Sequence, residues 1–100
     1  MAIYCFDLDG TLCSTDGASY LQATPLMDRI GKVNDLYDAG HQIIILTARG
    51  STTGIDWTDL TRDQLSSWGI RHHSLHLGKP TADMYIDDKG IRDSDFFNNL

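Results

Sequence analysis

Four short apolar runs occur along this chain, and stretches with helical periodicity lie between them. The runs cover residues 3–6, 42–47, 74–77 and 84–86. The first two are rich in aromatic or β-branched side chains and lack a polar residue at every second position, which is typical of strands covered on both faces. We therefore predict two buried strands at 3–6 and 42–47 and two further short strands at 74–77 and 84–86.

Two helices are predicted between these strands. Thr24 is a good N-cap and Pro25 suits the first helical position, so one helix is expected to begin there and to end at Gly40. Its apolar positions form one stripe at i, i+4, i+7 and i+11, namely Leu26, Ile30, Val33 and Tyr37. A second helix is expected over about 57–67, with Gly69 as its stop. The order βαβαβ(α)β indicates an α/β fold, a three-layer Rossmann-like core around a mainly parallel sheet.

Size and charge narrow the class of protein. One hundred residues suffice for one hydrophobic core, so we expect a single domain over 1–100. The formal charge is −6 and the 8 Lys and Arg residues are scattered, which disfavours a nucleic acid partner. The longest apolar run is too short to span a bilayer, so we expect no membrane contact and a cytoplasmic protein. Cys5 and Cys13 lack metal-ligand spacing and are expected to be reduced and structural.

A polar side chain closes or follows each predicted strand. In chain order these residues are Asp7 and Asp9, then Thr47, then Lys79, then Asp87 and Asp88. Because the carboxyl ends of parallel strands share one edge of a sheet, we expect these side chains to converge there. Several carboxylates in one place repel one another unless a cation neutralises them, and a site with only oxygen ligands suits Mg²⁺. Mg²⁺ commonly completes its shell with a phosphate oxygen, so the pattern predicts a phosphate ligand.

Each of these features also has an ordinary interpretation. The segment from Asp7 to Thr11 is compatible with a simple turn, and the late acidic pair with solvated surface charge. Lys79 is compatible with an exposed loop lysine, and Thr47 with an ordinary strand residue. Arg49 either reaches a substrate anion or forms a surface salt bridge. The histidines lack a common metal-ligand spacing, so zinc binding is not expected.

Taken together, the four polar motifs resemble those of the haloacid dehalogenase (HAD) superfamily of phosphotransferases. The first motif is Phe6-Asp7-Leu8-Asp9-Gly10-Thr11-Leu12, and Ile45-Leu46-Thr47-Ala48-Arg49 is similar to the second. Gly78-Lys79-Pro80 resembles the lysine motif, and Tyr85-Ile86-Asp87-Asp88 resembles the acidic fourth motif. The match spans residues 3–88, and four motifs in order are far more specific than the first motif alone.

The resemblance implies a catalytic role for four residues. Asp7 would be the nucleophile that forms an aspartyl-phosphate intermediate. Asp9 would be the general acid and base, which requires its carboxyl group to stay off the metal, so that its backbone carbonyl is the expected ligand. Thr47 would hydrogen-bond a phosphoryl oxygen. Lys79 would neutralise the nucleophile and the charge that develops on the transferred group.

The resemblance also implies a metal site and a substrate site. The expected cofactor is Mg²⁺, held by Asp7, Asp9, Asp87 and Asp88. Of the last two residues, either Asp88 contacts the metal directly and Asp87 through water, or the reverse. The expected substrate-binding residues are Thr47, Ala48, Arg49 and Lys79.

The chain lacks room for the cap domains that HAD members commonly insert. An open, capless site implies either a large substrate or a second subunit, a homo-oligomer, that covers the crevice. Small capless relatives associated with capsule or lipopolysaccharide sugar biosynthesis are the most similar, which makes a phosphorylated sugar the leading substrate class. The alternatives are a nucleotide or protein phosphatase of the same chemistry and a catalytically silent module that binds Mg²⁺ or phosphate.

Overall fold

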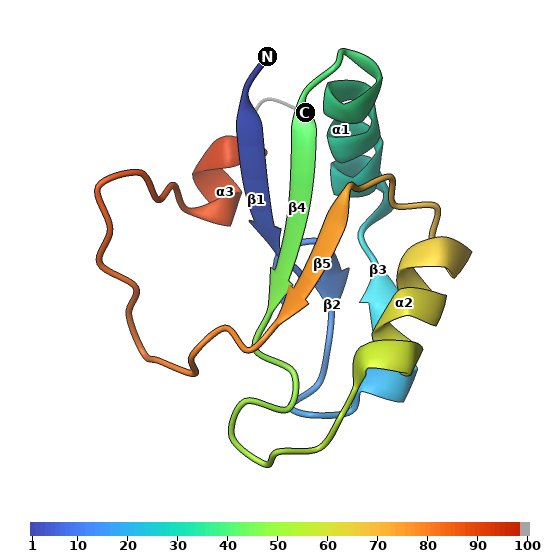
Figure 1. Cartoon of the computed structure of the whole chain (residues 1–100), viewed down its shortest axis with the longest axis vertical. Coiled ribbons are helices and arrows are strands. Elements are labelled where there is room, and N and C mark those ends of the chain that lie inside the picture. The colour runs from blue at the N-terminus through green and yellow to red at the C-terminus, as the bar shows by residue number, and fades with distance from the viewer. Residues whose placement is uncertain (99–100) are drawn as a thin grey trace.

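The computed structural model describes residues 1–98, which form an α/β fold around a parallel sheet of three strands (Figure 1). These strands are β1 (Ile3–Asp7), β4 (Gln42–Thr47) and β5 (Ser74–Leu77), in the spatial order β1-β4-β5. Helix α1 (Met27–Asp38) connects β1 to β4, and helix α2 (Thr58–Ser67) connects β4 to β5. The predicted class, a mainly parallel sheet flanked by helices, is therefore confirmed.

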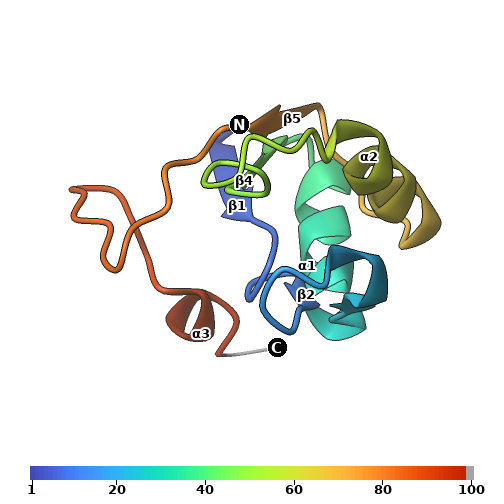
Figure 2. The ribbon, with the colours of Figure 1, turned by 90° about the horizontal axis from the view of Figure 1, so that it is seen from below.

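The three strands of this sheet were predicted closely from their apolar runs. Both connections advance across the sheet in the same direction, and α1 and α2 lie on the same side of it (Figure 2). On that face of β4, Ile43, Ile45 and Thr47 are buried. Ile44 and Leu46 point to the opposite face and are half-buried.

The predicted start of the first helix is wrong. Thr24 and Pro25 form the two-residue strand β3 (Thr24–Pro25), which pairs antiparallel with β2 (Cys13–Ser14). A short 3₁₀ helix, η1 (Tyr20–Gln22), precedes it. Since Thr24 is used in this ladder, helix α1 begins at Met27 and Leu26 takes the N-cap position without a side-chain cap. The end was predicted correctly, because Gly40 adopts a φ of 90°, as glycines that follow a helix often do.

The predicted fourth strand at 84–86 is also wrong. Every residue from 80 to 92 is exposed, and Met84 and Ile86 have exposed fractions of 78% and 95%. This segment swings away from the end of β5 and returns at a short helix that the sequence did not predict, α3 (Asp93–Phe96) (Figure 1). Phe96 and Phe97 pack on Tyr4 and Phe6 of β1. Local β-propensity predicted the strand, but pairing with a neighbour is what makes one.

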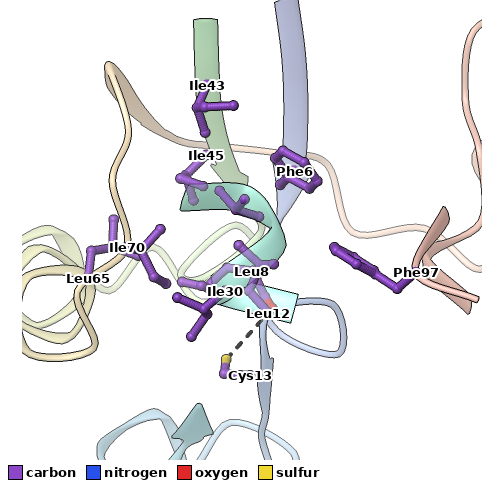
Figure 3. Close-up of a cluster of buried hydrophobic side chains, with 11 residues drawn as sticks. Phe6, Leu8, Leu12, Cys13, Ile30, Ile43, Ile45, Leu65, Ile70 and Phe97 are labelled. Atoms are coloured by element: carbon purple, nitrogen blue, oxygen red, sulfur yellow. Dashed lines mark hydrogen bonds between the residues drawn. The ribbon is translucent and has the colours of Figure 1, made fainter. Parts of the chain in front are cut away.

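The hydrophobic core holds the loop after β1 in place (Figure 3). Leu8 and Leu12 are fully buried among side chains of α1, β4 and α2, which include Ile30, Ile45 and Leu65. Backbone amides of residues 11 to 13 all donate to the Leu8 carbonyl. The polar residues that alternate with these leucines are therefore carried on a rigid turn.

No helix within residues 1–98 is long and apolar enough to cross a membrane.

Candidate functional site

Asp7 and Lys79 meet where β1 and β5 end. The Lys79 Nζ lies 3.4 Å from Asp7 Oδ1, and the Thr11 hydroxyl donates to Asp7 Oδ2 at 3.2 Å. Lys79 also lies over the ring of Tyr85, 4.2 Å from its centroid. The side chain of Asp7 is 33% exposed, so one part of its carboxylate remains open to solvent. The structure thus brings together the two residues that the sequence placed at the ends of different strands.

Thr47 supports this pair through its backbone. Its carbonyl accepts a hydrogen bond from the Lys79 amide at 3.1 Å. The Thr47 side chain is buried, and its hydroxyl accepts from the Arg49 amide at 3.2 Å. In this position Thr47 shapes the turn that follows β4, and its hydroxyl is not open to solvent.

Asp9 forms a fork-to-fork ion pair with Arg49. The Arg49 Nε donates to Asp9 Oδ2 and its Nη2 donates to Asp9 Oδ1, both at 2.9 Å. The Thr15 hydroxyl donates to the same carboxylate at 2.6 Å, and the Cys13 thiol adds a longer contact at 3.4 Å. Bidentate pairs of this kind fix orientation as well as adding energy. Asp9 is therefore held in one rotamer, two residues beyond Asp7.

The Nη1 group of Arg49 is also occupied. Its Nη1 donates to Thr61 at 3.1 Å and to Gln64 at 2.6 Å, and its guanidinium lies 4.7 Å from the ring centroid of Tyr20. Gln64 in turn donates to the Tyr20 carbonyl at 2.6 Å. Arg49 is only 2% exposed, so it is a buried ion-pair partner and does not face a substrate in this arrangement. The sequence left its role open between a contact with a substrate anion and a surface salt bridge, and the salt bridge that the structure shows is buried.

The partners of Arg49 were missed from the sequence. Gln64 and Thr61 lie on the face of α2 that also carries the buried Leu65. A glutamine three residues after a threonine on an apolar stripe is a useful sign, because buried polar groups need a partner. The matching charge comes from a different part of the chain, so the sequence alone could not identify it.

The ion pair controls the charge state of Asp9. Burial acts to raise the pKa of Asp9, but the hydrogen bonds from Arg49 and Thr15 outweigh it and lower the pKa below its ordinary value of 3.8. Asp9 is therefore a carboxylate at neutral pH and a weak proton donor while Arg49 holds it. Burial raises the pKa of the neighbouring Cys13 thiol to about 11, so this cysteine stays protonated.

Asp87 and Asp88 lie in the exposed segment after β5. The Asp87 carboxylate accepts from the Lys89 amide at 3.0 Å, and this bond is the main cause of its lowered pKa. Within residues 1–98, no three His, Cys, Asp or Glu side chains lie close enough together to hold a metal ion. The oxygen donors have the right chemistry for Mg²⁺. Their present placement does not gather the late pair with Asp7.

A small hollow adjoins the site on the side of β5. It has a volume of about 180 Å³ and lies between the loop after β4, the start of α2 and the end of β5. Gly50, at a φ of 81°, packs so closely on the Ile55 carbonyl that a side chain there would collide with it. The Ser51 hydroxyl donates to the Lys79 carbonyl at 2.7 Å, which ties this loop to the residue that faces Asp7.

Comparison with known proteins gives two structural neighbours. No protein-family model matches the chain, and no curated protein matches it significantly. A crystal structure of a structural-genomics target from Vibrio cholerae is similar over 100% of this chain and 90% of its own, with a TM-score of 0.87 and 27% identity. A chain of the Pnkp1/Rnl/Hen1 complex is similar over 99% of this chain and 34% of its own, with a TM-score of 0.60 and 23% identity. The second likeness is a likeness of fold alone.

Proposed function

We propose that this chain is a Mg²⁺-dependent phosphohydrolase of the HAD type that acts through an aspartyl-phosphate on Asp7. The observation that carries the proposal is the contact of 3.4 Å between the Asp7 carboxylate and the Lys79 ammonium at the carboxyl edge of a parallel sheet. Ligands of open parallel sheets bind at this edge. The four motifs that resemble the superfamily supply the reaction class.

In the proposed reaction, an Asp7 oxygen attacks phosphorus and the bond to the leaving oxygen breaks. Lys79 neutralises charge on the nucleophile and on the transferred group. Asp9 gives a proton to the leaving oxygen and then removes one from the water that hydrolyses the aspartyl-phosphate, which releases phosphate and restores Asp7. Because Arg49 favours the deprotonated form of Asp9, the proton donation requires this ion pair to loosen when substrate binds.

The proposed Mg²⁺ would be held by the Asp7 carboxylate, the Asp9 backbone carbonyl and one of Asp87 and Asp88. When bound, it would supply Lewis-acid stabilisation of the phosphoryl oxygens. This site needs the segment 80–92 to move toward Asp7. Since all of its residues are exposed, the movement gives up little buried surface. We expect Mg²⁺ alone to shift the backbone amide resonances of residues 84–90 and to slow proteolysis within the segment.

The leading substrate class is a phosphorylated sugar, because the site is open and is adjoined by a hollow of about 180 Å³ whose lining includes Ser51, Asp56 and Thr58. The runner-up is a nucleotide or phosphopeptide with the same reaction. Assays with sugar phosphates, nucleotides and phosphopeptides at equal concentration distinguish the leading class from the runner-up. Phosphate release from sugar phosphates alone supports the leading class, and a preference of at least about tenfold for either of the others replaces it.

The decisive experiment measures phosphate release from an aryl phosphate with and without Mg²⁺. We expect turnover only with Mg²⁺, and a loss of at least about a thousandfold in Asp7→Asn with unchanged thermal unfolding. Asp35→Asn is the matched control, because Asp35 is an exposed carboxylate on α1. Equal turnover by Asp7→Asn and wild type would reject Asp7 as nucleophile. A stable wild-type protein that binds Mg²⁺ without turnover would favour the silent module.

A further inference from the structure

A second hollow in the described part of the chain lies at the start of β5, away from Asp7. It has a volume of about 810 Å³ and opens between the end of α1, the outer side of α2 and residues 70–75. This volume falls in the usual range for small-molecule sites. Lys79 follows the opposite end of β5, so four strand residues, a span of roughly 13 Å, separate the two places.

The lining of this hollow is basic although the chain is acidic. Asp and Glu number 14 against 8 Lys and Arg in the sequence. The hollow is nevertheless lined by Arg62, Arg71, His72 and His73 together with the hydroxyls of Ser66 and Ser74, and by no carboxylate. We refer to this feature as the basic groove. Its composition is that of a surface that attracts an anion.

Both histidines of the basic groove are oriented by backbone groups. The Ile43 amide can only donate, and it lies 3.0 Å from His73 Nδ1, so Nδ1 accepts and Nε2 carries the proton of the neutral ring. His72 Nδ1 lies 2.9 Å from the Ile70 carbonyl, which can only accept, so there Nδ1 donates. His73 also stacks on Tyr37, with ring centroids 4.6 Å apart. The rings are thus fixed before any ligand arrives.

The chain between α2 and β5 is fixed as well. Asn34 of α1 donates to the Gly69 carbonyl and accepts from the Arg71 amide, each at 2.9 Å. The Arg71 guanidinium pairs with Asp38, but both side chains are more than half exposed. Exposed pairs of this kind are weak and exchange readily, so a stronger anion can displace Asp38. Arg62 is exposed and has no hydrogen-bond partner among the described side chains.

We propose that the basic groove is a second anion-binding site, which takes the phosphate group of a small molecule or free inorganic phosphate. A guanidinium fork, the Nε2–H donor of His73 and hydroxyls match the several oxygens of a tetrahedral oxyanion. Preorganised donors lower the entropy cost of binding. The proposal is independent of the hydrolase activity, because none of its residues belongs to the Asp7 site.

The test is a titration of the ¹⁵N-labelled full chain with inorganic phosphate in Mg²⁺-free buffer, read by amide chemical shifts. We expect saturable shifts at residues 70–75 with a Kd on the order of 1 mM. Arg62→Gln should raise that Kd at least about fivefold, whereas Arg92→Gln, which removes an equal charge elsewhere, should not. Asp38→Asn should lower the Kd about threefold, because it removes the competing carboxylate.

Parallel titrations distinguish the sources of the ligand. A sugar phosphate that binds more tightly than inorganic phosphate identifies a phosphorylated metabolite, and equal binding identifies free phosphate. Shifts that NaCl of equal ionic strength reproduces would overturn the proposal. So would shifts confined to residues near Asp7 and Lys79, or binding of an acidic peptide without binding of phosphate.

Discussion

The guanidinium of Arg49 and the carboxylate of Asp9 are joined by two parallel hydrogen bonds of 2.9 Å. Arg49 follows β4 and Asp9 follows β1, so this pair connects the ends of two neighbouring strands. Removing one member leaves the other charge poorly compensated, which is costly for the fully buried guanidinium. The pair therefore links the stability of the fold to the geometry beside Asp7.

Asp9→Asn should lower the free energy of unfolding by about 3 kcal/mol at pH 7. The folded-state pKa of Asp9 is lowered from 3.8, so its stabilising contribution is complete above that pH and is lost as the pH falls through the folded-state value. The difference between wild type and variant should be constant from pH 5 to 7 and should shrink toward pH 3. Urea unfolding across this range checks it, with Asp35→Asn as control. A difference that persists undiminished at pH 3 would contradict this account of the pair.

Arg49→Lys should cost about 3–5 kcal/mol of stability, because one ammonium cannot replace the fork or reach Thr61 and Gln64 as well. In the proposed enzyme the pH–rate profile should move to higher pH, since Asp9, which acts as both proton donor and acceptor, loses the hydrogen-bond donors that lower its pKa. Arg92→Lys, on an exposed arginine, should stay within about 0.5 kcal/mol of wild type. Denaturant unfolding and pH–rate profiles measure both effects. An Arg49→Lys protein as stable as the control would exclude a structural role for the pair.

Gly50→Ala should be more harmful than Gly54→Ala, although both glycines have positive φ values, 81° and 76°. Backbone strain costs about 1 kcal/mol at either position. Only at Gly50 would the new Cβ also collide with the Ile55 carbonyl, whereas Gly54 faces open space. Thermal unfolding of the two variants gives the comparison. Equal losses would mean that the loop relaxes around the collision.

Cys5 should react with a thiol reagent in the native protein, whereas Cys13 should not. Cys5 is exposed and Cys13 is fully buried. Burial raises the pKa of Cys13 to about 11, so at pH 8 only roughly one molecule in a thousand carries its thiolate. Intact mass after iodoacetamide treatment should show one adduct in buffer and two in denaturant. Two adducts in the native state would show that the turn after β1 opens readily.

The sequence predicted the sheet well because its strands are defined by local composition. The run at 42–47 became β4 with the same bounds, and 74–77 became β5. The run at 84–86 has similar local propensity but no neighbouring strand, and its side chains lie in solvent. Thr24 and Pro25 illustrate the same limit, since pairing with Cys13 and Ser14 outweighed their capping preference.

The part of the candidate site that lies at the ends of strands could be predicted from the sequence. Asp7 and Lys79 meet because parallel strands share a carboxyl edge, which the order of elements already implied. The buried partners of Arg49 depend on side chains from α2 and on the backbone at Tyr20, and neither follows from the spacing of residues. Asp87 and Asp88 were predicted to bind Mg²⁺ because they would follow a strand at 84–86. Without that strand, their role remains a prediction that requires the segment to lie closer to Asp7.

The backbone of Lys79 is held on both sides, by Thr47 at the end of β4 and by Ser51 in the loop that follows. Its amide donates to the Thr47 carbonyl and its own carbonyl accepts from Ser51. The backbone that carries this cation is therefore positioned by the chain before it, and within the exposed segment 81–92 it is Tyr85 whose ring contacts the Lys79 ammonium. Circular permutation that opens new termini within this exposed segment should leave the Asp7–Lys79 pair intact. The segment is therefore a suitable place to interrupt the chain in redesigned variants.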